Sequence, residues 1–194
     1  MSRIVTRIAP CLFVLALVSA PGGESLAATR ANSLEVGAFI PYTLFDHDWE
    51  LDNSAGYGVR VGWNFAKGGE VEVSYAVMSS SMSDTSGIDA DVDVTTLNVA
   101  LIRNWRAGSK LVPFFYGAGS WVTPKAKGSD LPPSDEFNFR NERGELGITL
   151  GGGVRYYLGD RLNVRAEAHG MLITPDSQKN LEVLVGMGWV FGGK

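Results

Sequence analysis

Eight short segments between Ser33 and Phe191 alternate apolar and polar residues, and the stretches that join them are alternately long and short. The connections run 13, 4, 12, 6, 20, 3 and 7 residues. Apolar residues at period two indicate β-strands, and alternating loop lengths are typical of an antiparallel barrel that crosses an outer membrane. We therefore predict an all-β fold, an eight-stranded antiparallel up-and-down transmembrane β-barrel. Its strands are expected at 33–41, 55–65, 70–78, 91–104, 111–123, 144–157, 161–173 and 181–191.

The N-terminal stretch has the pattern of a cleavable signal peptide. Arg3 and Arg7 precede an apolar run at 11–18, and small residues follow it. That run is too short to cross a bilayer as a helix. Cleavage fits after Ala20 or after Ala27, and we prefer Ala27. The expected organisation is thus a signal peptide at 1–27 and one barrel domain at 28–194.

Composition excludes several classes of function. The single cysteine, Cys11, lies inside the signal segment, so the exported chain has no thiol for disulfides or catalysis. Because Cys11 lies within the apolar run and not after it, we expect no lipoprotein anchor. The formal net charge is −4 and no basic patch is present, so no nucleic-acid partner is expected. No later apolar stretch approaches 18 residues, so any membrane must be crossed by strands.

The two faces of the segments decide between two kinds of closed barrel. A soluble ligand-binding barrel turns its apolar face inward, whereas a membrane barrel turns it toward lipid. Glycine covers little on a water-facing strand but fits the narrow interior of eight strands, so we assign the polar, glycine-rich face to the lumen. The glycines assigned there are Gly58, Gly62, Gly117, Gly119, Gly147, Gly151, Gly153, Gly186 and Gly188. Aromatic residues near strand ends suit the interfacial girdles, namely Tyr57, Phe65, Tyr75, Trp105, Tyr156, Trp189 and Phe191.

One segment departs from strict alternation. In 91–104, Val92 and Val94 are out of phase with Leu97, Val99 and Leu101. A β-bulge shifts the alternation by one residue. We therefore expect either a bulge there or emergence of the strand from the membrane.

Two motifs resemble the OmpA-type outer-membrane barrel superfamily. One is the stretch Pro113–Gly119, which is similar to the family's fifth strand. The other is 151–167, in which a glycine-rich strand ends in Arg-Tyr, turns at Gly-Asp and returns with Arg-x-Glu. The resemblance covers the whole exported chain in layout and implies an outer-membrane barrel. Two departures are that Gly192, Gly193 and Lys194 follow the aromatic Phe191, and that no peptidoglycan-binding domain is expected.

Charged residues on the polar face are the main candidate site. We predict a lumen charge network made of Arg60, Glu72, Arg155, Arg165, Glu167 and His169. Charges in a low-dielectric interior are tolerated only when paired, so the network is expected to plug the lumen. A gated narrow pore, opened when ion partners exchange, is the alternative.

Other candidate residues lack the partners that a catalytic or metal site requires. His169 could serve a lipid A-modifying hydrolase, but the residue two positions on is Met171, not a serine nucleophile. Asp46-His47-Asp48 could bind a divalent ion, but two carboxylates and one imidazole in a loop are expected to be solvated. Asp89–Asp93 has the alternating acids of a calcium loop but lacks the glycine at its sixth position and the distant glutamate. We therefore expect no catalytic residue, metal or cofactor. Phe137 and Phe139, in the longest connection, are the candidate loop contacts, since binding residues concentrate in long loops.

The sequence therefore predicts an integral protein of the cell outer membrane with a structural or surface-contact role and no enzymatic activity. Its expected partners are outer-membrane lipid, lipopolysaccharide and, during insertion, the barrel-assembly machinery; a monomer is expected. The alternatives are a narrow channel for small solutes, a lipid A-modifying enzyme and a periplasmic ligand-binding barrel.

Overall fold

A computed structural model of the chain describes residues 29–46, 51–83, 89–127, 144–174 and 178–193. Eight antiparallel strands close into one barrel in sequence order, with β1 paired to β8. This confirms the predicted fold class. Within the described residues, no helix is long and apolar enough to cross a membrane. The strands are β1 Ser33–Leu44, β2 Ser54–Ala66, β3 Gly69–Ser83, β4 Asp89–Asn104, β5 Leu111–Lys127, β6 Glu145–Tyr157, β7 Leu162–Ile173 and β8 Gln178–Gly192.

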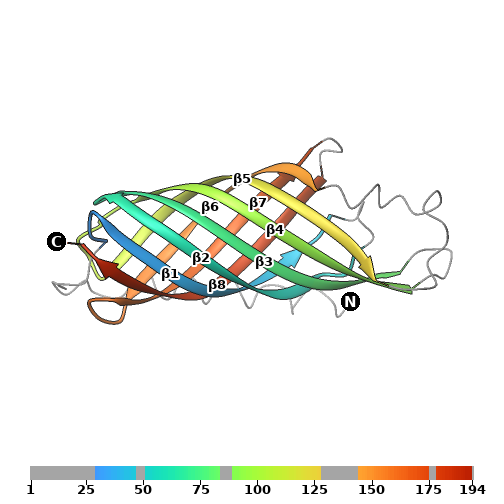
Figure 1. The fold of residues 1–194 in the computed structure, drawn as a ribbon, viewed down its shortest axis with the longest axis horizontal. Coiled ribbons are helices and arrows are strands. Elements are labelled where there is room, and N and C mark those ends of the chain that lie inside the picture. Colours follow the sequence, from blue (N-terminus) through green and yellow to red (C-terminus); the bar gives the residue numbers. More distant parts are fainter. Residues whose placement is uncertain (1–28, 47–50, 84–88, 128–143, 175–177, 194) are drawn as a thin grey trace, which may run out of the picture.

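The barrel is elongated, and its strands are steeply tilted to the long axis (Figure 1). We call the end where β1 begins and β8 ends the terminal end, and the opposite end the loop end. The connections at the terminal end are short, such as Lys67–Gly68 between β2 and β3. The strands β3, β4 and β5 have 15, 16 and 17 residues, and they extend farthest at the loop end.

The predicted strands are accurate to one residue at the terminal end, and at the loop end six of the eight are too short, whereas those predicted for β6 and β7 are accurate to one residue there too. For example, β3 runs to Ser83 and β5 to Lys127, whereas the expected ends are 78 and 123. The added stretches are polar or mixed, so they carry no period-two signal, yet the ladder between β3 and β4 continues through them. Apolar and polar residues alternate only where one face of a strand must be apolar. A strand that extends beyond the membrane has no face in contact with lipid, so its sequence need not alternate.

Of the two explanations offered for the phase change in the fourth strand, the bulge is wrong. Pairing of β4 with both β3 and β5 is continuous from Asp91 to Arg103. Val92 and Val94 face the lumen in the same phase as Thr96 and Asn98, and they are buried in an apolar cluster there. The register shift lies instead between β2 and β3, near Trp63 and Ala66.

Apolar side chains cover the outside of the barrel. Val61 is 47 % exposed, Trp63 53 % and Val185 61 %, whereas Arg60 is 3 % exposed. The predicted aromatic residues also lie outside, and Tyr57 is 72 % exposed. A water-soluble barrel would bury these residues around its ligand. The periplasmic ligand-binding alternative is therefore wrong, and the wide apolar surface requires lipid contact.

Two of the nine glycines assigned to the lumen lie on the opposite face. In β5 the inward residues are Phe114, Tyr116 and Ala118, so Gly117 and Gly119 face outward. A Cβ built on Gly119 would meet nothing within 4 Å. The run Phe114-Phe115-Tyr116 has no alternation from which to read the phase, and a shift of one residue moves every side chain to the other face.

The inward glycines of β6 are required by close approach of the neighbouring strand. A Cβ on Gly151 would collide with the backbone oxygen of Ala168, and one on Gly153 with that of Ala166. Backbone oxygens cannot move aside without breaking the β6–β7 ladder. Glycine therefore permits the tight inner curvature of an eight-stranded barrel.

Candidate functional site

Three arginines and four glutamates meet inside the barrel and form what we call the lumen charge network: Arg60, Arg155, Arg165, Glu35, Glu70, Glu72 and Glu167. All seven are buried, with at most 4 % of their surface exposed. They come from β1, β2, β3, β6 and β7, so every ion pair except Arg165–Glu167, which lies within β7, crosses the lumen or joins neighbouring strands. The network therefore ties the inner wall of the barrel together from several sides.

Arg165 is the central cation of the network. Its Nη1 lies 2.6 Å from Oε2 of Glu72 and 3.8 Å from Oε1 of Glu35, and its Nη2 lies 2.9 Å from Oε2 of Glu167. Arg60 Nη1 is 2.5 Å from Oε1 of the same Glu167. Short charge-assisted bonds of this kind are the strong ones inside proteins. One glutamate, Glu167, thus bridges two arginines.

Arg155 holds the part of the network nearer the terminal end. Its Nη2 donates to Oε2 of Glu70 at 2.9 Å, and its Nη1 lies 3.5 Å from Oε2 of Glu35. Asn104 Nδ2 also donates to Glu70 Oε2, at 3.4 Å. The order of residues in the sequence does not predict these ion pairs, since Arg155 and Glu35 are on strands that are not neighbours in the barrel.

Aromatic rings contact the guanidinium groups of the three arginines, in addition to the carboxylates. The guanidinium of Arg60 lies 4.4 Å from the ring centre of Phe39, and that of Arg165 lies 4.8 Å from the ring centre of Phe114. Arg155 approaches the same Phe114 ring at 5.7 Å. A cation near an aromatic face is stabilised by the ring's quadrupole, most strongly where water is absent. These rings fill the lumen and hold the arginines in place.

His169 extends the polar contacts toward the loop end. Its Nε2 lies 3.3 Å from Oε2 of Glu167, and its ring stacks on Tyr116 with centres 4.2 Å apart. The β7–β8 register sets His169 opposite Glu182, whose Oε1 accepts from Thr43 Oγ1 at 3.2 Å. Within the part of the chain that the structure describes, the side chain of His169 contacts Glu167 and Tyr116 and not a serine or threonine hydroxyl. Among these residues the histidine is oriented but does not activate a nucleophile.

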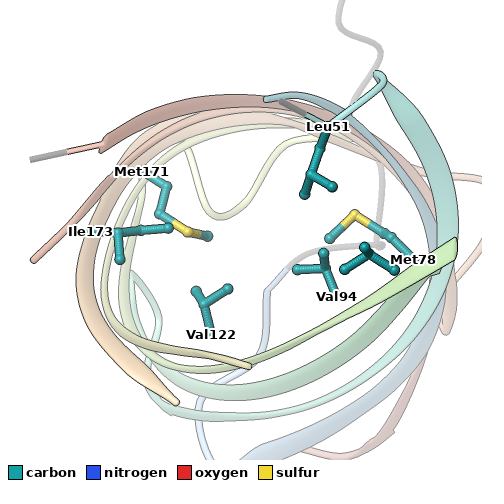
Figure 2. Close-up of a cluster of buried hydrophobic side chains, with 7 residues drawn as sticks. Leu51, Met78, Val94, Val122, Met171 and Ile173 are labelled. Carbon is teal, nitrogen blue, oxygen red and sulfur yellow. The ribbon is translucent and has the colours of Figure 1, made fainter. Parts of the chain in front are cut away.

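Apolar clusters lie at both ends of the polar lumen. Toward the terminal end, Val112, Tyr157 and Val190 pack together, and Thr29 Oγ1 lies 3.3 Å from the Tyr157 hydroxyl. Toward the loop end is a larger set, which we call the loop-end cluster. Its side chains project from the wall into the interior (Figure 2), and its members are Leu51, Met78, Val92, Val94, Val122, Met171 and Ile173.

The six residues predicted for the lumen all lie inside the barrel, and each of them takes part in at least one of the ion pairs there. Two glutamates of the network are missing from the prediction. Glu70 is on the predicted polar face of its strand, and Glu35 alternates with Leu34, Val36 and Ala38, so the same period-two rule identifies both. The predicted loop contacts Phe137 and Phe139 lie outside the described residues, as does the signal segment at 1–27.

The acidic stretches form no metal site within the described residues, where no group of three ligating side chains comes together. Asp46 instead accepts a hydrogen bond from the backbone of Lys179 at 2.9 Å. Asp93 accepts from Ser79 Oγ at 2.7 Å and faces Lys125 across the β4–β5 ladder. His47 and Asp48 lie outside the part of the chain that the structure describes.

Comparison with known proteins agrees with this architecture. A family model described as "Outer membrane protein beta-barrel domain" matches residues 12–191. The chain belongs to this family of outer-membrane β-barrels. Its location is accordingly the outer membrane of a Gram-negative bacterium. No curated protein matches the chain.

Solved structures of the same fold are distant in sequence. The barrel domain of Pseudomonas aeruginosa OprF is 16 % identical, with a TM-score of 0.54, and the match covers 84 % of this chain and 99 % of that one. Ail, the attachment invasion locus protein of Yersinia pestis, is 13 % identical with a TM-score of 0.60, covering 83 % and 99 %. OprG of Pseudomonas aeruginosa is 13 % identical with a TM-score of 0.61, covering 87 % and 100 %. At these identities the likeness establishes the fold alone.

Proposed function

We propose that this outer-membrane barrel is a non-catalytic structural or surface-contact protein whose lumen is plugged by the lumen charge network. One observation carries the proposal: Arg60, Arg155 and Arg165 are buried and each is paired with carboxylates from other strands. The same groups that would line a pore are therefore engaged with one another. The aromatic rings of Phe39 and Phe114 pack against Arg60 and Arg165.

The energetics favour a closed lumen. A permeating ion would meet the paired groups of the network, among them Arg165 and Glu72, whose charged atoms are 2.6 Å apart. Leaving one partner of a buried ion pair unpaired costs about 3–5 kcal/mol. Since each opening would disturb more than one such pair, the open state is expected to be rare.

Electrical recording tests the plug directly. Purified protein inserted in a planar bilayer is expected to show no large, stable conductance at neutral pH. The control is the same protein with the network disrupted by Arg60→Ala, which removes the cation between Glu72 and Glu167. Steady openings of the native protein on the nanosiemens scale would contradict the plugged lumen.

A narrow channel is the second candidate, and one observation favours it. Several buried polar atoms near the terminal end have no hydrogen-bond partner within the described structure, including both side-chain polar atoms of Asn64 and of Asn163. Buried polar groups are nearly always satisfied, by water where protein groups are absent. A hydrated compartment would thus adjoin the network. Small, cation-selective openings in the same recordings would support this candidate, because the network has four carboxylates and three guanidinium groups.

Absence of catalysis is part of the proposal. The histidine that could act as a base contacts Glu167 and the ring of Tyr116, and it lies inside the barrel and not on the lipid face. An enzyme acting on lipid A would need its base beside a nucleophile that the lipid can reach. We expect the mass spectrum of lipid A to be unchanged by overexpression of this protein, with a strain carrying the empty vector as control. A shifted lipid A mass that disappears with His169→Ala would establish an enzyme.

The proposed partners follow from the outer surface. Its apolar belt would contact membrane lipid, its loop end would contact lipopolysaccharide, and the barrel-assembly machinery would insert it. A monomer is proposed because a closed barrel has no unpaired sheet edge around its circumference. The name of the Yersinia pestis protein refers to attachment, but at 13 % identity this lends the surface-contact role no support.

A further inference from the structure

One member of the loop-end cluster does not belong to any strand. Leu51 lies between β1 and β2, yet only 8 % of its surface is exposed. Its side chain points into the barrel interior toward residues from β3, β4, β5 and β7 (Figure 2). The six other members of the cluster are themselves 0–3 % exposed. A connecting residue thus completes an apolar cluster inside the lumen.

The segment that carries Leu51 is fixed to the end of β3. Asp52 N donates to the backbone oxygen of Ser81 at 3.0 Å, and the backbone oxygen of Asp52 accepts from Ser80 Oγ at 2.6 Å. Ser54 Oγ bonds the backbone oxygen of Ser79 one step further along the same strand. These bonds hold the Leu51 backbone at the β3 side of the barrel mouth. The extension of β3 beyond its apolar stretch supplies the partners, which explains why that polar extension is ordered.

The other side of the same connection is fixed to β8. Asp46 N donates to Oδ1 of Asn180 at 3.0 Å, and Lys179 N donates to Oδ2 of Asp46 at 2.9 Å. Phe45 packs on the loop-end cluster, and its N donates to Oδ1 of Asn53 at 3.2 Å. Residues 45–46 and 51–53 are therefore held to strands on both sides of β1 and β2, and they are joined to each other.

We propose that residues 45–46 and 51–53 form a strap that seals the loop end of the lumen, with Leu51 as its stopper. The members of the loop-end cluster carry only hydrocarbon or thioether side chains, and buried polar residues such as Thr43 and Asn180 border them. This seal excludes water, whereas the lumen charge network excludes ions by pairing. The two barriers lie in series along the axis, with His169 and Thr43 between them. The inference deepens the proposed function, since it adds a second and separately removable barrier to the plugged lumen.

Thiol accessibility tests the strap without requiring a conductance. In a chain with Cys11→Ala, the variant Val94→Cys puts a thiol in the sealed layer and Lys125→Cys puts one on the exposed loop end of β5. A charged, membrane-impermeant thiol reagent is added from outside to folded protein in vesicles. Because a buried site reacts only through local opening, the Val94→Cys thiol should react at least about tenfold more slowly than the Lys125→Cys thiol.

Removal of the stopper should reverse this protection. Leu51→Gly is expected to accelerate labelling of the Val94→Cys thiol by about tenfold or more. Leu158→Gly, the same change at an exposed leucine of the terminal end, should leave it unaltered. Asn180→Ala, which removes the acceptor for Asp46 N, should accelerate labelling to a smaller extent. It provides a second route if Leu51→Gly yields little folded protein.

Two results would overturn the strap: rapid labelling of the Val94→Cys thiol in the native background, or labelling that neither Leu51→Gly nor Asn180→Ala accelerates. Conductance of the Leu51→Gly protein separates the two barriers. If labelling is fast but the bilayer remains silent, the strap is a seal and the lumen charge network still blocks ions. If the Val94→Cys thiol labels rapidly in the native background while the bilayer stays silent, the strap fails and the plugged lumen stands. Steady conductance of the native protein contradicts both barriers, because they lie in series.

Discussion

Replacing Arg165 by methionine is expected to lower the free energy of unfolding by about 3–5 kcal/mol, because it leaves Glu72 and Glu167 buried with one cation fewer. Methionine retains much of the length of the side chain, so the change removes charge more than volume. Urea unfolding in detergent micelles or vesicles measures the loss, and heat-modifiable migration on a gel reports the folded fraction.

Arg161→Met is the matched control for this variant. Arg161 is four residues away, at the exposed turn between β6 and β7, and its loss should change stability by less than about 0.5 kcal/mol. Adding Glu72→Gln to Arg165→Met should restore part of the stability, since it removes one of the unpaired charges. If Arg165→Met unfolds at the same urea concentration as Arg161→Met, the network contributes nothing and the lumen must be hydrated.

An arginine placed on the outer face, halfway along the barrel, should lower the free energy of unfolding nearly as much as Arg165→Met does. Val185 lies in the middle of β8 and is 61 % exposed on the outside of the barrel. Val185→Arg is expected to cost about 2–4 kcal/mol in a bilayer, because the guanidinium would face the hydrocarbon core. The measurement is reversible urea unfolding in vesicles of fixed lipid composition.

The control uses the same strand and the same face at a different depth. Leu181 is also outward and lies four residues nearer the loop end. An arginine at the membrane interface costs only about 0–1 kcal/mol, so Leu181→Arg should be tolerated. Equal and small effects at both positions would mean that water, and not lipid, surrounds the belt.

The strand pattern was predictable because each outward residue meets the same environment. Val59, Val61 and Trp63 all face lipid, so period two is strict through the middle of β2. The pattern weakens where that constraint ends. The loop-end part of β3 follows from pairing with β4, and the turn residue Arg106 adopts a left-handed φ of 52°. Neither feature leaves an apolar pattern in the sequence.

The sequence alone determined which residues of this protein face the lumen in most strands, because side-chain direction alternates locally along a strand and needs no knowledge of the partner. It also determined the number of strands and the membrane class. Only the tertiary structure decided which charges meet: Arg155 pairs with Glu35 and Glu70, and Arg165 with Glu72, across strands far apart in sequence. Those pairings depend on the stagger of strands on closing the barrel, and alternation within a strand carries no information about stagger. The inward position of Leu51 likewise depends on residues that are far away in the sequence. Hydrogen bonds of the neighbouring Asp52 to β3 hold this segment in place.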